Sequence, residues 1–97
     1  MTEAQVQRAF QAEVKRRGGK AYKLHGSPYS VAGQPDVIGA LDGVSFAVEF
    51  KTEGKRPTPK QEHELAAWAA QGWAAGVATS VEEALAIVGP MRARAET

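Results

Sequence analysis

The feature that most constrains the fold of this 97-residue chain is a pair of apolar runs joined by Asp42-Gly43. Asp-Gly between two alternating apolar segments is typical of a two-residue β-hairpin turn. We therefore expect strands over residues 37–41 and 44–51, with Leu41 paired with Val44.

Three charged residues lie on this apolar hairpin, namely Asp36, Glu49 and Lys51. The expected register places Asp36 directly opposite Glu49, and alternation puts Lys51 on the same face as Glu49. Directly opposed like charges are destabilising, so the two acids need an explanation. Three explanations are open. The acids share a proton, they bind a divalent cation through hard oxygen ligands, or they face water at frayed strand ends. Lys51 weighs against the last explanation, because it adds a cation on the same face.

Start and stop signals predict the other elements of the chain. Capping boxes beginning at Thr2 and Thr58 open two helices, and Ser80 caps a third. In chain order we expect a helix over 2–17, strands over 20–25, 37–41 and 44–51, a helix over 58–72, a strand over 75–79, a helix over 80–88 and a loose tail over 89–97. The order αβββαβα predicts a single domain over 1–97 of the mixed α/β (α+β) class.

The composition excludes several classes of protein. The chain has no cysteine, which excludes disulfides and thiolate metal sites and fits an intracellular setting. No apolar run approaches the length of a membrane span, and no signal sequence opens the chain. The net charge is only +1, so the total charge does not by itself indicate a nucleic-acid partner.

Basic residues are nevertheless grouped on both sides of the hairpin. The first group is Lys15, Arg16, Arg17, Lys20 and Lys23, and the second is Lys51, Lys55, Arg56 and Lys60. Groups of this kind are either phosphate-binding surfaces or solvated faces, and at this size a solvated face is the simpler explanation.

The segment QPDVIGALDGVSFAVEFK resembles the core of the PD-(D/E)XK nucleases, with Pro35-Asp36 followed by Glu49-Phe50-Lys51. The flanking segments TEAQVQRAFQAEVKRRGGKAYKL and EFKTEGKRPTPKQEHELAAWAAQGWAAGVATSVEEAL resemble the VRR-NUC (virus-type replication-repair nuclease) domain, as does GQPDVIGAL. The resemblance covers residues 2–88. It implies the restriction-endonuclease-like fold, in which helices flank a central mixed β-sheet.

The resemblance also implies roles for single residues. Asp36 and Glu49 correspond to metal ligands, and the Phe50 carbonyl is the expected third ligand. Lys51 corresponds to the residue that orients or deprotonates the attacking water or stabilises the phosphorane. Glu3 and Gln61 match an acid on the first helix and a glutamine on the second.

Both of these last matches have a plainer explanation. Glu3 is equally a helix-start acid that is favoured by the helix dipole. Gln61 is equally the capping-box partner of Thr58. We expect that one side chain cannot serve fully both as this cap and as a functional group.

The function implied by the resemblance is a Mg²⁺- or Mn²⁺-dependent DNA endonuclease, acting on branched DNA such as four-way (Holliday) junctions as a homodimer. No small-molecule cofactor or membrane is implied, and the expected location is the cytoplasm, or the host cytoplasm for a phage-encoded protein. The expected DNA contacts are Lys15, Arg16, Arg17, Lys20, Lys23, Ser27, Tyr29, Lys55, Arg56 and Lys60. The alternatives are a flap, nicking or duplex endonuclease, a non-catalytic nucleic-acid-binding module, and a structural metal-binding protein.

Aromatic and histidine residues elsewhere give weaker signals. We expect Trp68 in the core, on the face of Leu65, and Trp73 in packing or at a partner interface. His25 and His63 have no ligand spacing to each other, so surface or packing roles are expected for both.

Overall fold

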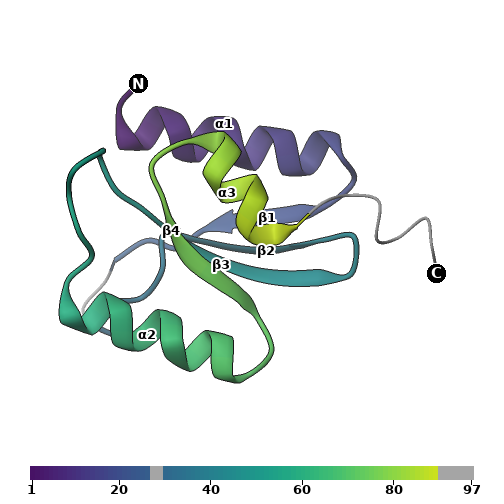
Figure 1. The fold of residues 1–97 in the computed structure, drawn as a ribbon. Coiled ribbons are helices and arrows are strands. Elements are labelled where there is room, and N and C mark those ends of the chain that lie inside the picture. Colours follow the sequence, from purple (N-terminus) through teal and green to yellow (C-terminus); the bar gives the residue numbers. More distant parts are fainter. Residues whose placement is uncertain (27–29, 90–97) are drawn as a thin grey trace.

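The structure is a computed structural model that describes residues 1–26 and 30–89 (Figure 1). Its elements are α1 (Glu3–Arg16), β1 (Lys20–Lys23), β2 (Val37–Leu41), β3 (Val44–Phe50), α2 (Pro59–Ala70), β4 (Ala74–Ala78) and α3 (Val81–Val88). The element order is the predicted one, with bounds that differ by at most two residues. Ser27, Tyr29 and the tail over 90–97 lie outside the described residues. In the described part of the chain, no helix combines the length and apolar character needed to cross a membrane.

The sheet is mixed, in the strand order β1-β2-β3-β4. Neighbours are antiparallel except β3 and β4, which are parallel and are connected through α2. The hairpin register is confirmed, because Leu41 pairs with Val44 across a turn in which Asp42 and Gly43 both have positive φ. An α+β architecture with a central mixed sheet is therefore confirmed.

The hairpin ladder ends earlier than expected, at the pair Val37 and Val48. The Asp36 N–H donates to the Val48 carbonyl at 3.1 Å, so the backbone is offset by one residue where we expected Asp36 squarely opposite Glu49. The physical reason lies in the Asp36 side chain, whose Oδ2 accepts the Phe50 N–H at 2.9 Å. At the end of β3, the Asp36 carboxylate thus accepts a hydrogen bond that a backbone carbonyl of the neighbouring strand would otherwise accept.

Helices cover the two faces of the sheet unequally (Figure 1). α1 and α3 lie on one face and enclose the core, in which the Phe10 ring meets Phe46 at 5.4 Å and Phe50 at 5.6 Å between centroids. α2 lies alone on the opposite face, against β3 and β4. Residue alternation therefore puts the apolar side chains of β3 under α1 and α3, and Ala47 and Glu49 under α2.

α2 is only lightly packed. Leu65 is its one buried residue, and Ala66 and Ala67 are exposed. Trp68 was expected in the core but is half-buried, because it packs edge-on against Trp73 at 4.4 Å at the end of the helix. The two indoles line an apolar hollow of about 300 Å³ at the surface.

Candidate active site

Asp36, Glu49 and Lys51 meet where β2 begins and β3 ends. Asp36 reaches across to the backbone of Phe50, which lies between the other two residues in the chain. Lys51 Nζ lies 3.5 Å from Glu49 Oε2, and the lysine side chain is 18% exposed whereas that of Glu49 is 4% exposed. An acid pair and one cation therefore share a site that solvent reaches at Lys51.

The Glu49 carboxylate is buried with its two oxygens in different environments. Oε2 accepts a hydrogen bond from Gln61 Nε2 at 2.8 Å and faces Lys51. Oε1 is buried and has no hydrogen-bond partner in the described part of the chain. Burial, and after it the charge of Asp36, raise the pKa of Glu49 to about 7, although Lys51 acts to lower it.

Gln61 corrects one expectation from the sequence, because its carboxamide serves two roles at once. Its Oε1 accepts the Thr58 N–H at 2.8 Å and completes the capping box of α2. Its Nε2 donates to Glu49 Oε2. The reason is that the amide has a separate acceptor and donor. The cap occupies the acceptor and so leaves the donor aimed at Glu49.

Glu3 is held in place by a residue that the sequence reasoning did not single out. The Thr52 N–H and the Thr52 Oγ1 both donate to Glu3 Oε2, each at 2.8 Å. The hydroxyl hydrogen bond is the main cause that lowers the pKa of Glu3, and Lys51 adds to it through its charge. Glu3, Lys51 and Thr52 also line a cavity of about 310 Å³ between α1, β3 and α3. The only sequence signal for Thr52 was its position directly after Lys51.

The donor set of this site fits a hard divalent cation. Carboxylate oxygens are the ligands that Mg²⁺ and Mn²⁺ prefer, and Glu49 Oε1 is a buried oxygen that has no partner among the residues that the structure describes. No group of three or more His, Cys, Asp or Glu side chains gathers within residues 1–26 and 30–89. A metal here therefore depends on Asp36 and Glu49, and the Phe50 carbonyl remains the predicted third ligand.

Gly33 explains why the loop before Asp36 needs a glycine. Its φ is +81°, and a Cβ at this position would lie 2.6 Å from the Lys60 carbonyl carbon and 2.9 Å from the Gln61 nitrogen. The loop thus packs its backbone directly on the first turn of α2. This contact brings the helix that carries Gln61 to the strand that begins after Asp36.

The predicted DNA-binding residues fall into two classes. Arg16 and Arg17 pair with Glu13 at 2.6 and 2.7 Å, and these two arginines lower the pKa of Glu13 to about 2. Lys23 donates to the buried Gln7 at 2.5 Å. Arg16, Arg17 and Lys23 therefore use their side chains in contacts within the chain. The exposed members are Lys15, Lys20, Lys55, Arg56 and Lys60, and none of their side chains makes a hydrogen bond or ion pair that is seen within residues 1–26 and 30–89.

Comparison with known proteins bears directly on the family. No protein-family model and no curated protein matches the sequence. Among solved structures, one named "VRR_NUC domain" has 28% sequence identity and a TM-score of 0.72, over 89% of this chain and 92% of that chain. The chain therefore resembles VRR-NUC domain proteins in sequence and in fold.

Two further structures share the fold of this chain. One named "VRR_NUC domain protein" has 22% identity and a TM-score of 0.75, over 97% of this chain and 90% of that one. The other is Hjc of Archaeoglobus fulgidus, a Holliday junction resolvase from an archaeal hyperthermophile. It has 20% identity and a TM-score of 0.62, over 79% of this chain and 67% of that one.

Proposed function

We propose that this chain is a VRR-NUC protein and acts as a metal-dependent endonuclease that hydrolyses phosphodiester bonds of DNA. The observation that carries the proposal is the buried Glu49 carboxylate, which has one unpartnered oxygen and lies beside Lys51 and Asp36. The likeness to VRR-NUC domain structures and to the resolvase Hjc supports a nuclease of this fold.

The residues of the site divide the chemistry among them. A bound Mg²⁺ or Mn²⁺ supplies an activated water and neutralises charge that develops on the phosphate. Asp36, Glu49 and the Phe50 carbonyl are the groups that would hold it. Lys51 is the solvent-reachable cation of the site, and it orients or deprotonates the attacking water or stabilises the phosphorane.

Gln61 and Glu3 support these groups rather than react. Gln61 holds Glu49 Oε2 and so leaves Oε1 as the oxygen for the cation. Glu3 binds the residue that follows Lys51 and places a negative charge near the ammonium group.

Two alternative functions are less well supported by the site. A purely structural cation site gains nothing from the ammonium group 3.5 Å from one of its ligands. A non-catalytic DNA-binding module has no need of a buried acid with a raised pKa, whose ionised form destabilises the fold.

The substrate that we propose is branched DNA, such as a four-way junction, cut by a homodimer. Hjc, a structural neighbour, is a Holliday junction resolvase. Resolving a four-way junction takes two incisions related by two-fold symmetry, and each protomer has one Asp36–Glu49–Lys51 site. A closed two-fold dimer supplies both sites through one self-complementary patch, and the hollow beside Trp68 and Trp73 is a candidate for it.

The proposed activity is tested with labelled single strand, duplex, flap and four-way junction, each incubated with EDTA, Mg²⁺ or Mn²⁺. We expect cleavage only with metal and paired, symmetric cuts in the junction. Preferred cutting of the flap, or a single nick, favours the alternative flap or nicking endonuclease. Failure to cut any substrate with either metal contradicts the proposal.

A further inference from the structure

The sheet face that carries Glu49 is only half covered. α2 packs over β3 and β4, whereas on the β1 and β2 side of the same face Lys20, Tyr22 and Ala40 are exposed. Tyr22 is 62% exposed, among the most exposed large hydrophobic residues of the described chain. We call Lys20, Tyr22, Ile38 and Ala40 the open face.

The strand register shows how close the open face is to the acids. Tyr22 pairs with Ile38, and Ile38 pairs with Ala47. Asp36 lies two residues before Ile38 and therefore on the same face as Tyr22. One strand spacing and two residues of rise put the Cα atoms of Tyr22 and Asp36 about 8 Å apart. The side chain of Tyr22 thus begins close enough to the acids to reach a nucleotide next to the proposed scissile phosphate.

The composition of the open face suits a strand of nucleic acid. Lys20 alternates onto the same face as Tyr22 and is exposed, whereas Lys23 turns to the opposite face and donates to Gln7. Ile38 and Ala40, the neighbours on β2, are uncharged, and Ala40 is too small to cover an aromatic ring. An exposed ring beside a cation on a β-sheet is the arrangement on which unpaired bases stack while the backbone binds the positive charge.

We propose that Tyr22 stacks an unpaired DNA base that is adjacent to the phosphate held at Asp36 and Glu49, and that Lys20 contacts a neighbouring phosphate. The proposal rests on the proposed nuclease function and narrows its substrate. A base stacked on Tyr22 is absent from an intact duplex, so the preferred DNA has an unpaired or displaced base at the cut, as at a branch point.

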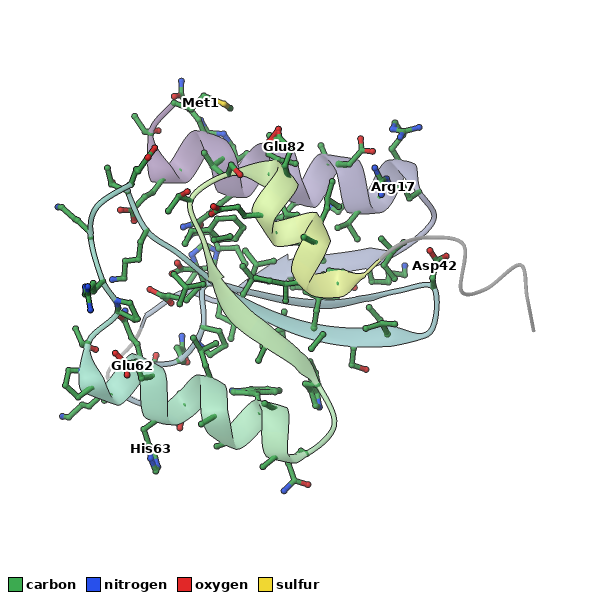
Figure 2. The ribbon with its side chains drawn as sticks, in the orientation of Figure 1. Met1, Arg17, Asp42, Glu62, His63 and Glu82 are labelled. Atoms are coloured by element: carbon green, nitrogen blue, oxygen red, sulfur yellow. The ribbon has the colours of Figure 1, made fainter. Side chains whose placement is uncertain are left out.

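The test measures the Kd of labelled DNA by fluorescence anisotropy in EDTA, where cleavage does not interfere. The probes are a single-stranded oligonucleotide, a four-way junction and a blunt duplex. The variants are Tyr22→Ala and Tyr22→Phe. His63→Ala is the matched control, because His63 is an exposed ring on α2 that points away from the sheet (Figure 2). Melting temperatures of all variants establish that they are folded.

We expect Tyr22→Ala to weaken single-strand binding about tenfold, within the range for loss of one base–aromatic stack. Duplex binding should change less than about twofold, and Tyr22→Phe and His63→Ala should both resemble wild type. An equal loss on single strand and duplex, a loss of the same size in Tyr22→Phe, or no loss in Tyr22→Ala overturns the stacking role. If the Tyr22→Ala variant cuts the junction and its Kd is unaltered, the stacking role of Tyr22 is rejected while the proposed nuclease function is not. A wild-type protein that binds none of the probes contradicts both.

Discussion

At the scale of single residues, Glu49 carries the largest electrostatic penalty in the site. Its side chain is 4% exposed, and burial and Asp36 together raise its pKa from 4.5 to about 7. The ionised form is therefore disfavoured in the folded protein, and the opposing effect of Lys51 is only partial. A cation bound at Oε1 would compensate the same charge, so a position that is unfavourable for a lone acid fits the proposed metal ligand.

The raised pKa predicts a pH dependence of stability without metal. Because the folded pKa lies above the ordinary value, the contribution of Glu49 to stability is complete below about pH 4.5 and is lost as the pH rises through about 7. The loss is at most roughly 3 kcal/mol. Glu49→Gln should remove this dependence and be more stable than wild type at pH 8. Urea unfolding in EDTA at pH 5.5 and pH 8 measures it, and parallel curves for the two proteins contradict it.

Sequence reasoning singled out Asp36, Glu49, Lys51 and Gln61, which the structure brings together, but it misjudged how some side chains are used. The motif consists of residues that are close in sequence. The hydrogen bond between Thr52 and Glu3, in contrast, depends on how α1 packs at the end of β3, which the motif does not show. Residues 14–35 contain no acid, and the basic group within this span was expected to be either a phosphate-binding surface or a solvated face. Glu13, one residue before that span, neutralises two of its arginines because it lies one turn before them on the helix.

At the scale of elements, both capping boxes and the hairpin turn were predictable, because each depends on residues within four positions. The end of the hairpin was not, because it depends on a side chain that competes with the backbone for the Phe50 N–H. The contact through which Gln61, a capping residue of α2, reaches Glu49 was also not predictable. It requires the loop at Gly33 to approach the backbone of Lys60, which no local pattern encodes.

This loop contact predicts different effects for two glycines of similar conformation. Gly33 and Gly54 have φ of +81° and +89°, but only Gly33 faces neighbouring backbone. Gly54→Ala should therefore cost only the conformational strain, about 1–2 kcal/mol. Gly33→Ala should cost about 1–3 kcal/mol more through overpacking, and it should reduce cleavage because α2 and Gln61 move from Glu49. Urea unfolding and single-turnover cleavage of both variants measure the difference. Equal effects of the two substitutions contradict the contact.

At the scale of the whole molecule, the sequence predicted the element order and the class, and the resemblance supplied the mixed sheet. The division of helices between the faces required the structure, since α2 is too weakly amphipathic to reveal which face it covers. This arrangement matters for function. With α1 and α3 enclosing the core on one face, α2 leaves the other face partly open next to the acids.

Metal should stabilise the whole fold, because it binds the native site and not the unfolded chain. We expect Mn²⁺ to raise the Tm of wild type by several degrees. Asp36→Asn should lose that rise and keep or exceed the wild-type Tm in EDTA, since the repulsion with Glu49 is relieved. Thermal melts of both proteins with and without Mn²⁺ decide the matter. An equal rise in both rules out a site shared by Asp36 and Glu49.

The proposed dimer is tested by multi-angle light scattering at micromolar concentration. We expect twice the mass of the 10.3 kDa chain. Trp73→Ala should favour the monomer if the Trp68–Trp73 hollow is the interface, because it removes one wall of the apolar patch. A wild-type protein that is a monomer at these concentrations contradicts the paired-cut mechanism.

Single-turnover cleavage of a labelled four-way junction by Lys51→Ala, with Mn²⁺ and saturating enzyme, tests the central claim most directly. Lys55→Ala is the matched control, since Lys55 is exposed and lies outside the acid pair. We predict that Lys51→Ala cuts at least 100-fold more slowly than wild type while its Kd for DNA changes little. Lys55→Ala should cut at the wild-type rate once saturated and show weaker binding with a shallower salt dependence. A Lys51→Ala protein that cuts at the wild-type rate would contradict the assignment of Asp36, Glu49 and Lys51 as a nuclease site.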